Sequence, residues 1–343
     1  MATILVTGGC GFIGSHIVDA LVERGETVRV LDLLHPLAHD REPAYLNPAA
    51  EYVRGDVQDS ELVARCLDGV DAVSHQAAMV GLGLDFGDVV DYVRTNDVGT
   101  ATLLRELAHR PVPLVLASSM VVYGEGRYRC AEHGVVQPEP RTRTTLERGS
   151  FEPPCPRCGE ALEPESVPED APLEPRSVYA ATKAQQERLC EAYARETGAP
   201  VTALRYHNVY GPRMPRDTPY AGVASIFRSA VAAGQAPRVF EDGRQLRDFV
   251  HVRDVATANA IALATGTPGA FNVASGEPHT IGQLAHGLSA AVDGPEPVTT
   301  GEYRLGDVRH VFASTERAAA VLGFRARVSF VDGVGELATA ELR

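Results

Sequence analysis

A glycine-rich turn directly after the first apolar strand constrains the fold of this chain more strongly than any other feature. Ile4-Leu5-Val6 is followed by Thr7-Gly8-Gly9-Cys10-Gly11-Phe12-Ile13-Gly14, and a helical pattern begins at Ile13. Glycines let the backbone turn tightly and approach a pyrophosphate, which then lies at the helix N-terminus. The turn therefore predicts a dinucleotide-binding unit, with cofactor contacts from Gly8, Gly11, Phe12, Ile13 and Gly14.

An acidic residue ends the second expected strand. Asp32 follows Gly14 by 18 residues, close to the spacing at which a carboxylate binds the adenosine ribose hydroxyls and repels a 2′-phosphate. We therefore expect the chain to bind NAD in preference to NADP, with Asp56 and Val57 beside the adenine. The alternatives are a glycine-rich turn without a ligand and a simple loop acid at position 32.

Strand-like and helix-like segments alternate through the first two thirds of the chain. Further strands are expected at 28–31, 72–74, 114–117 and 201–205, and helices at 13–24, at 96–109 and around Lys183. This order predicts an α/β protein with a doubly wound parallel sheet of the Rossmann type. We expect residues 1–205 to form the NAD-binding domain. Residues 206–343 should form mainly a smaller substrate-binding lobe, with some segments returning to the first domain.

Composition argues against several classes of protein. The 343 residues carry a net charge of −13, which disfavours nucleic acid and anionic membranes as partners, although local arginines can still bind a phosphate. No apolar run approaches the ~20 residues needed to cross a bilayer, and the N-terminus lacks the pattern of a signal peptide. The six cysteines are too few for a disulfide scaffold in a chain of this length. A cytoplasmic protein is expected.

Lys183 is the only lysine of the chain, although lysine and arginine together number 32. An ammonium is a compact point charge, whereas a guanidinium is a broad planar fork, so a site that needs the point charge retains its lysine. Lys183 follows Tyr179 by four residues, the helical offset that places side chains close together. We expect Lys183, together with a positively charged nicotinamide, to lower the pKa of Tyr179, which could then act as a base. The alternative is a surface helix pair.

Eight segments, in order and over nearly the whole chain, resemble the extended short-chain dehydrogenase/reductase superfamily in its nucleotide-sugar epimerase/dehydratase branch. They are TGGCGFIG, HQAA (75–78), TNDVGT (95–100), ASSMVVYG (117–124), YAATK (179–183), RYHNVYGPR (205–213), RDFVHVRDVA (247–256) and RLGD (304–307). The resemblance implies a catalytic set of Ser119, Tyr179 and Lys183. Tyr179 would take the proton from a sugar hydroxyl, Lys183 would also hold the nicotinamide ribose, and Ser119 would stabilise the reacting oxygen.

The same resemblance implies further contacts. The expected cofactor-binding residues also include Ala77, Ala78, Asn96, Ser118, Tyr179, Lys183 and His207, where Asn96 would support the structure near the catalytic pair and His207 could equally be a packed core histidine. The expected substrate-binding residues are Met79, Ser119, Met120, Tyr179, Asn208, Arg247 and Arg304. Asn208, Arg247 and Arg304 match positions that hold the nucleotide diphosphate, which suits the arginine fork. A homodimer is expected from the resemblance alone.

The residues after Ser119 bear on the reaction. Related 4,6-dehydratases carry an Asp-Glu pair there and related decarboxylases a glutamate, whereas this chain has Met120 and Val121. Elimination needs acid and base groups beyond the tyrosine, so a 4-epimerase is favoured. Within the family, SSMVVYGEG, NVYGPR and the cysteine-bearing insert are most similar to dTDP-L-rhamnose 4-epimerases. The alternatives are a UDP-hexose or UDP-hexuronate 4-epimerase, a 4-keto-sugar reductase, and a non-catalytic NAD-sensing regulator.

Residues 125–176, rich in Pro, Glu and Arg, interrupt the alternating pattern and indicate an inserted loop. Within it Cys130 and His133 are separated by 21 residues from Cys155 and Cys158. Two ligand pairs with this separation predict a structural zinc site, closed by four protein ligands. Pro156 and Gly159 would allow the tight turn of the second pair. The alternatives are incidental cysteines, a redox switch at Cys155 and Cys158, and a zinc module that binds a partner.

Overall fold

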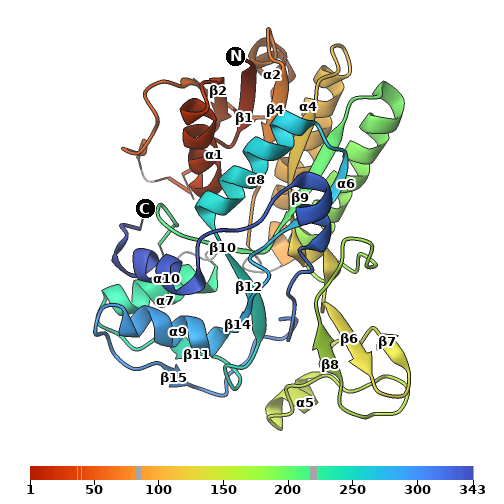
Figure 1. The fold of residues 1–343 in the computed structure, drawn as a ribbon, viewed down its shortest axis with the longest axis vertical. Coiled ribbons are helices and arrows are strands. Elements are labelled where there is room, and N and C mark those ends of the chain that lie inside the picture. Colours follow the sequence, from red (N-terminus) through yellow and green to blue (C-terminus); the bar gives the residue numbers. More distant parts are fainter. Residues whose placement is uncertain (37, 40, 82–85, 217–221, 343) are drawn as a thin grey trace.

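A seven-stranded parallel sheet forms the centre of the protein in a computed structural model that describes residues 1–36, 38–39, 41–81, 86–216 and 222–342 (Figure 1). The strand order is β13-β9-β5-β4-β1-β2-β3. The bounds are β1 (Thr3–Thr7), β2 (Thr27–Asp32), β3 (Glu51–Arg54), β4 (Ala72–His75), β5 (Leu114–Ser119), β9 (Val201–Tyr206) and β13 (Gly269–Val273). The predicted Rossmann-type α/β sheet is therefore confirmed.

The order of the strands reverses at β1. The chain runs from β1 through β2 to β3 on one side, and then continues with β4, β5, β9 and β13 on the other. Thr7, the last residue of β1, pairs with Leu31 of β2 and with His75 of β4. In open parallel sheets a ligand binds outside the carboxyl ends of the strands at such a reversal. The crevice expected for the cofactor thus begins at Thr7.

Helices cover both faces of the sheet. On one face lie α1 (Phe12–Glu23) and α8 (Val252–Thr265), and on the other lie α2 (Ser60–Cys66), α4 (Gly99–Leu107) and α6 (Val178–Thr197). Strand residues alternate between the faces. Ile4 and Val6 pack with the first pair of helices, and Leu5 packs with the other set. This double burial explains the continuous apolar runs of the strands.

A capping serine and a left-handed glycine mark the two ends of α6, the helix that carries Tyr179 and Lys183. The side chain of Ser177 accepts a hydrogen bond from the backbone N–H of Ala180, which caps the first turn. Gly198 ends the helix in the left-handed conformation at φ 74°. The helix is thereby fixed at the end where Tyr179 lies.

The expected helix at 96–109 begins earlier in the structure and is not regular. It continues from η1 (Phe86–Asp88) and α3 (Val89–Tyr92) through a π-helical turn, η2 (Val93–Val98), into α4. Such turns insert an extra residue into the helical path and occur frequently at functional sites. Asn96 lies within this turn, and periodicity alone gave no sign of the extra residue.

The C-terminal lobe has its own core. It contains a sheet of β10 (Asn208–Tyr210), β12 (Leu246–His251) and β14 (Pro278–Thr280), a short pair of β11 (Arg238–Val239) and β15 (Val298–Thr299), and the helices α7 (Val223–Ala232), α9 (Ile281–Ala290) and α10 (Phe330–Thr339). Phe227, Phe249, Leu284 and Leu337 pack together in this core. The segments α8, β13 and η4 (Ala318–Leu322) return to the Rossmann sheet.

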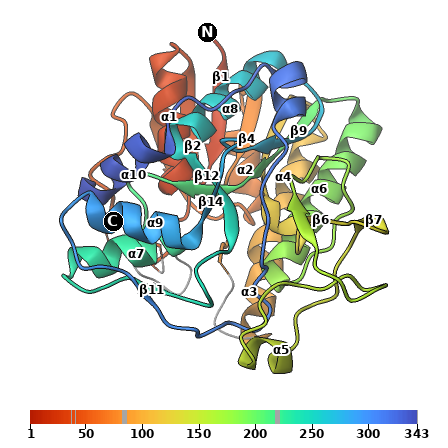
Figure 2. The same ribbon diagram turned by 60° about the horizontal axis from the view of Figure 1, so that its bottom comes forward.

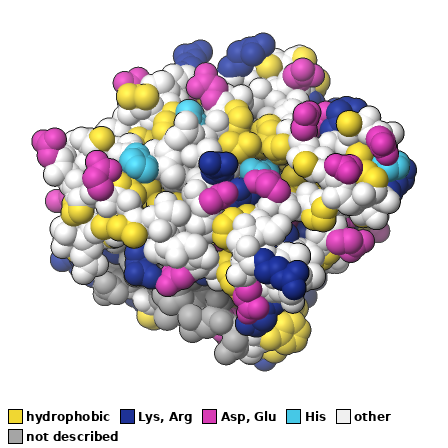
Figure 3. Space-filling model, turned by 90° about the horizontal axis from the view of Figure 1, so that it is seen from below, with side chains coloured by type: hydrophobic (Ala, Val, Ile, Leu, Met, Phe, Trp, Pro, Cys, Tyr) yellow, Lys and Arg dark blue, Asp and Glu magenta, His cyan; other side chains and the backbone are white. Residues whose placement is uncertain are grey.

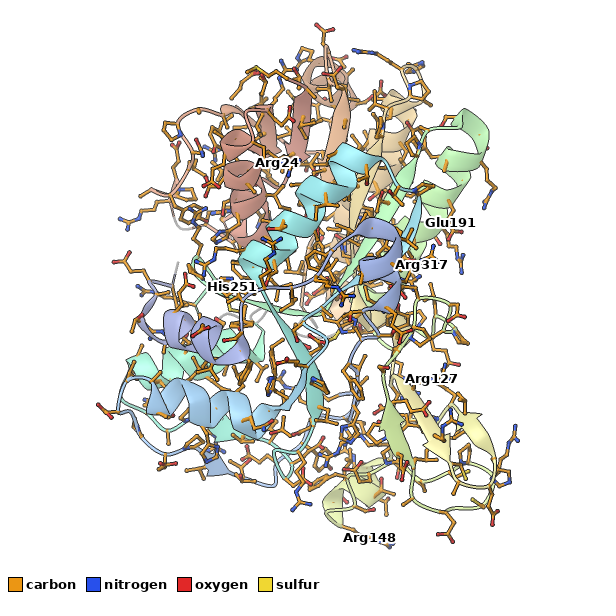
Figure 4. All side chains as sticks on the ribbon, viewed as in Figure 1. Arg24, Arg127, Arg148, Glu191, His251 and Arg317 are labelled. Carbon is orange, nitrogen blue, oxygen red and sulfur yellow. The ribbon has the colours of Figure 1, made fainter. Side chains whose placement is uncertain are left out.

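The inserted loop forms a small folded unit beside the lobe. After η3 (Met120–Tyr123) it contains β6 (Arg127–Cys130), β7 (Gly134–Val136), α5 (Arg143–Glu147) and β8 (Glu163–Glu165), with the strands in the order β7-β6-β8. Tyr128, Val136 and Leu162 pack with two cysteines in its core. Figure 2 shows the lobe and this unit on opposite sides of the central strands. In Figure 4, Arg127 marks where the unit begins and Arg148 marks the end of α5.

No helix in the described ranges is long and apolar enough to cross a membrane.

Candidate active site

The glycine turn lies directly against the chain that follows β4. Gly8 has φ +70°, and a Cβ there would lie 2.7 Å from the backbone nitrogen of Ala77. A Cβ on Gly14 would lie 2.1 Å from the carbonyl oxygen of Gly8. Gly11 is the N-cap of α1, and no side chain caps that end. The helix N-terminus is therefore open to an anion, which fits the pyrophosphate of NAD.

Asp32 lies beside this turn. Its carboxylate accepts hydrogen bonds from the backbone N–H of Cys10 at 2.9 Å and of Leu34 at 2.8 Å. The acid predicted from spacing therefore sits at the carboxyl end of β2, half-buried next to the turn. This position suits a contact with the adenosine ribose.

The other expected cofactor positions follow the neighbouring strands. Asp56 accepts a hydrogen bond from the backbone N–H of Gln58 at 2.9 Å, and Val57 is buried against Gly99. Ala77 and Ala78 follow β4, where the N–H of Ala77 donates to the hydroxyl of Thr7 at 3.2 Å. All of these residues lie at the carboxyl edge of the sheet.

The three predicted catalytic residues come together from two elements. Ser119 is the last residue of β5, Tyr179 lies in the first turn of α6, and their side chains are hydrogen-bonded. The Nζ of Lys183 donates to the carbonyl oxygen of Ala117 at 2.8 Å and lies 5.9 Å from the centroid of the Tyr179 ring. Lys183 is only 3% exposed, so it is not the surface partner that a bare sequence pattern allows.

Within the chain alone, burial dominates the electrostatics of this set, and Lys183 is not among the groups that lower the pKa of Tyr179. Burial raises the pKa of Tyr179 to about 12, and the hydrogen bond from Ser119 offsets only part of this rise. Burial also lowers the pKa of Lys183 to about 8, against the opposite influence of Cys190, Glu187 and Asp97. The chain's own groups thus keep the phenol neutral and leave the lysine mostly protonated at pH 7. A phenolate requires additional positive charge near the ring.

Asn96 connects the catalytic helix to the loop after β4. Its side chain accepts a hydrogen bond from the N–H of Met79 at 2.8 Å and donates to the carbonyl of Met79 at 3.0 Å. It also donates to the hydroxyl of Thr182 at 2.9 Å, between Tyr179 and Lys183. Asn96 is fully buried. These contacts match the supporting role expected of it and occupy its amide within the protein.

Two buried polar groups were not foreseen from the sequence. His75 bonds the hydroxyls of Thr7 at 2.7 Å and Thr100 at 2.9 Å, and burial lowers its pKa to about 3, so the ring is neutral. Glu187, one turn after Lys183, binds Arg205 and accepts a hydrogen bond from Ser118. The Ser118 hydroxyl, expected at the cofactor, therefore faces α6. Each partner lies at least 18 residues away, beyond the reach of local patterns.

The expected contacts at 207 and 208 lie where the sheet meets the lobe. His207 is buried, and burial lowers its pKa to about 4, so its ring is neutral. The side-chain oxygen of Asn208 is buried and has no hydrogen-bond partner within the described part of the chain. Such an oxygen favours a ligand donor. Met120 packs at the base of the insert, against Val122 and its neighbours.

Arg247 and Arg304 both lie close enough to Asp307 to act on its charge. Burial raises the pKa of the Asp307 carboxyl, and Arg247 and Arg304 act in the opposite direction. Arg247 donates through Nη1 to the carbonyls of Leu246 and Arg309, at 2.8 and 2.9 Å, and through Nη2 to that of Val308 at 2.7 Å. The two arginines expected at the diphosphate therefore lie within electrostatic range of the same carboxyl group. Figure 3 shows charged side chains of both signs near the middle of the face seen from below.

The four predicted metal ligands converge within the insert. The candidate ligand atoms of Cys130, His133, Cys155 and Cys158 lie within 4.8 Å of one another. The Cys130 sulfur is 3.4 Å from His133 Nδ1 and 3.7 Å from the Cys158 sulfur, and the Cys155 sulfur is 3.7 Å from His133 Nδ1. Tetrahedral zinc with Zn–S of about 2.3 Å and Zn–N of about 2.0 Å has edges of about 3.5–3.8 Å. Gly159, at φ +78°, closes the turn of the second pair.

Comparisons with known proteins agree with this fold and site. The family model described as NAD dependent epimerase/dehydratase family matches residues 4–148 and 155–274. The chain therefore belongs to this family, and it is an NAD-dependent nucleotide-sugar enzyme. The resemblance inferred from the eight segments is confirmed.

The similar proteins are named as nucleotide-sugar enzymes with different reactions and substrates. The chain is 34% identical to a dTDP-L-rhamnose 4-epimerase of Burkholderia thailandensis, over 98% of this chain and 94% of the relative. It is 30% identical to a dTDP-glucose 4,6-dehydratase of an Actinoplanes species, over 97% and 95%. Among solved structures, the UDP-glucose 4-epimerase of Thermotoga maritima with UDP-glucose has a TM-score of 0.80 at 31% identity, over 98% of this chain and 97% of that one. The UDP-glucose 4-epimerase of Thermus thermophilus with NAD has a TM-score of 0.77 at 31% identity and the same coverage.

Proposed function

We propose that the protein is a nucleotide-sugar 4-epimerase that oxidises and re-reduces carbon 4 of the sugar with bound NAD. The observation that carries this proposal is an assembled Ser119, Tyr179 and Lys183 set followed by Met120 and Val121 instead of acids. Met120 packs among apolar residues at the base of the insert. Dehydration would need a second acid and base at that place.

The proposed roles follow from the geometry. Tyr179 takes the proton of the carbon-4 hydroxyl and later returns it, while Ser119 donates a hydrogen bond to the reacting oxygen. Bound NAD⁺ would supply the hydride acceptor and a positive charge. Lys183 keeps a protonated ammonium beside the ring and holds the nicotinamide ribose. Because burial alone raises the pKa of Tyr179 to about 12, proton transfer from the substrate is coupled to the presence of that charge.

The proposed substrate is a dTDP-6-deoxyhexose such as dTDP-L-rhamnose. The Burkholderia relative, matched over nearly its full length, supports this choice. UDP-hexose and UDP-hexuronate epimerisation are the alternatives, because UDP-glucose 4-epimerases and a UDP-glucuronic acid 4-epimerase of Bacillus cereus share the fold. A 4-keto-sugar reductase would use the same residues but release the oxidised cofactor. A sensing role without catalysis would not require the assembled catalytic set. A homodimer remains proposed from the family resemblance.

Purified protein without added cofactor is expected to convert one nucleotide sugar into its 4-epimer. The measurement is NMR of separate incubations with dTDP- and UDP-linked hexoses, 6-deoxyhexoses and hexuronates. A new epimer without net change in NADH absorbance supports the proposal. A reaction that needs stoichiometric NADH would identify a reductase instead, and loss of water from the sugar would identify a dehydratase.

We also propose that Cys130, His133, Cys155 and Cys158 bind a structural zinc ion. Their spacing in the sequence and their atom–atom distances both fit a tetrahedral S₃N site. Four protein ligands leave no coordination position for a reacting water, so the ion would stabilise the insert without taking part in catalysis.

The purified protein is expected to contain about one zinc ion per chain by elemental analysis. Cys155→Ala should lose the metal and lower the thermal midpoint of the protein. Cys66→Ala is the matched control, because Cys66 is equally buried but lies in α2, outside the cluster. Equal metal contents in wild type and Cys155→Ala would contradict the site.

A further inference from the structure

The segment 307–311 lies between the insert and β12. The carbonyl oxygen of Leu246 in β12 accepts a hydrogen bond from the N–H of Val311 at 3.2 Å, and Arg247 forms a parallel bridge with Val311. On the other side, a Cβ on Gly126 would lie 2.4 Å from the carbonyl oxygen of His310, so the insert packs directly on the segment. Figure 1 shows the insert and the lobe meeting near this part of the chain.

Insert residues contact the segment through polar side chains. Glu125 accepts a hydrogen bond from the N–H of Arg309, and the hydroxyl of Tyr128 accepts one from the N–H of His310 at 3.2 Å. Glu152 binds the side chains of Arg309, at 2.6 Å, and of His310, at 2.9 Å. Arg309 is fully buried, so its charge depends on these partners and on Glu241 and Asp242 of the lobe.

Arg141 of the insert contacts both segment 307–311 and the lobe residue Glu241. Its side chain is only 4% exposed. Its Nη2 donates to the carbonyl oxygen of Asp307 at 2.6 Å, and its Nη1 binds the carboxylate of Glu241 at 2.9 Å. Glu241 has φ 53°, a left-handed conformation that is costly for a residue other than glycine. Arg141 and Arg309 both bind the carboxylate of this residue.

Arg247, which lies in β12, contacts the backbone of the same segment. Its guanidinium donates to the carbonyls of Val308 and Arg309, which fixes the plane of the fork. Of the five N–H donors of an arginine, three bind backbone carbonyls within the described residues, including that of Leu246. The Nε–H and one Nη2–H remain, and they form the edge that can meet two phosphate oxygens. The placement of this edge depends on where residues 308 and 309 lie.

The insert and its four-ligand cluster are coupled to these contacts over short stretches of chain. Tyr128 precedes Cys130 by two residues, and Glu152 precedes Cys155 by three. Arg141 also donates to the carbonyl oxygen of Phe151 at 3.2 Å, which ties it to the segment that leads to Cys155. Ordering of the cluster therefore orders the residues that contact segment 307–311.

We propose that Arg141 is a positioning residue for the nucleotide diphosphate: it fixes segment 307–311 and thereby aims Arg247 and Arg304 at the phosphates. The inference rests on the proposed function, in which these two arginines hold the diphosphate. Arg141 itself is occupied by Asp307 and Glu241 and acts through its neighbours. The insert thus serves substrate affinity, whereas none of its contacts with segment 307–311 involves the glycine turn or Asp32 of the NAD site.

The test compares Arg141→Met with Arg129→Met in the holoenzyme. Arg129 belongs to the same insert, is 48% exposed, and binds only Glu165 of the insert among the described residues. The measurements are calorimetric dissociation constants for dTDP and UDP, the kcat and KM of the epimerase reaction, and the content of bound NAD. Arg141→Met is expected to raise the dissociation constant and KM about tenfold, which corresponds to about 1.4 kcal/mol. Its kcat and NAD content should stay near wild type, and Arg129→Met should change none of these values.

A second variant distinguishes a loss of nucleotide affinity from misfolding of the protein. Arg141→Lys keeps the charge but supplies one point donor instead of a fork, so its affinity should lie between wild type and Arg141→Met. Wild-type affinity for dTDP and UDP in both Arg141 variants would overturn the proposal, as would an equal loss in Arg129→Met. If wild type binds neither nucleotide diphosphate, the proposed function itself fails, and the inference fails with it. Nucleotide binding without epimerisation would refute only the proposed reaction.

Discussion

Tyr179→Phe is expected to retain NAD and to lose at least about 100-fold in kcat, because a positioned general acid–base group contributes about 10²–10⁴. The phenylalanine ring fills the same space in α6, so the helix and the Lys183 contact with Ala117 should persist. Only the hydroxyl that bonds Ser119 is removed. The measurements are kcat on the active nucleotide sugar and the absorbance of bound NAD in the purified variant.

Tyr193→Phe is the matched control for this variant. Tyr193 lies on the same helix, but its hydroxyl donates to the carbonyl oxygen of Val112 at 3.4 Å, away from Ser119. The control should keep wild-type turnover. Epimerisation by Tyr179→Phe at the wild-type rate would refute the proposed proton transfer.

Lys183→Arg is expected to be the second most damaging change, with kcat reduced about 100-fold. Lys183 is almost completely buried, and its ammonium donates to Ala117 at 2.8 Å. A guanidinium is larger and planar, so it cannot occupy the same place without moving Tyr179 or the end of β5. Charge is conserved in this variant, so a loss of activity would report on the shape of the cation.

The pH dependence gives a second readout of Lys183. Burial lowers its pKa to about 8, so the ammonium is present below this pH and is lost as the pH rises through it. Turnover that depends on the ammonium should therefore decline above about pH 8 in the wild type. The residual activity of Lys183→Arg should lack this decline, because a guanidinium keeps its proton throughout. A full wild-type rate in Lys183→Arg would show that the point charge is not needed.

Local patterns predicted the parts of the site that depend on short stretches of chain. The glycine turn, Asp32 and the Tyr179–Lys183 offset each follow from geometry within one strand–helix unit, and the structure places them as spacing requires. The cysteine and histidine spacing likewise predicted the convergence of four ligand atoms. These features share one property: the partners are close in sequence or lie on paired strands.

Features that depend on burial or on distant partners were not accessible from the sequence. Burial raises the pKa of Tyr179, and the sequence did not indicate this rise because the depth of burial is a tertiary property. Arg141 and Arg309 look like surface charges in a chain rich in arginine. Their acidic partners Glu241 and Glu152 lie 100 and 157 residues away. Only the folded chain shows that they form a buried junction.

The pairing of β6 with β8 also reduces the loss of chain entropy that occurs when Ser119 and Tyr179 are brought together. Ser119 and Tyr179 are separated by 59 residues, most of which belong to the insert. Arg127 pairs with Glu165, so only 22 of these residues remain in the loop that must close. The shorter loop lowers the entropic free-energy cost of bringing Ser119 and Tyr179 together by about 0.9 kcal/mol. The insert can therefore be long without holding the serine and the tyrosine apart, provided that its two ends stay paired.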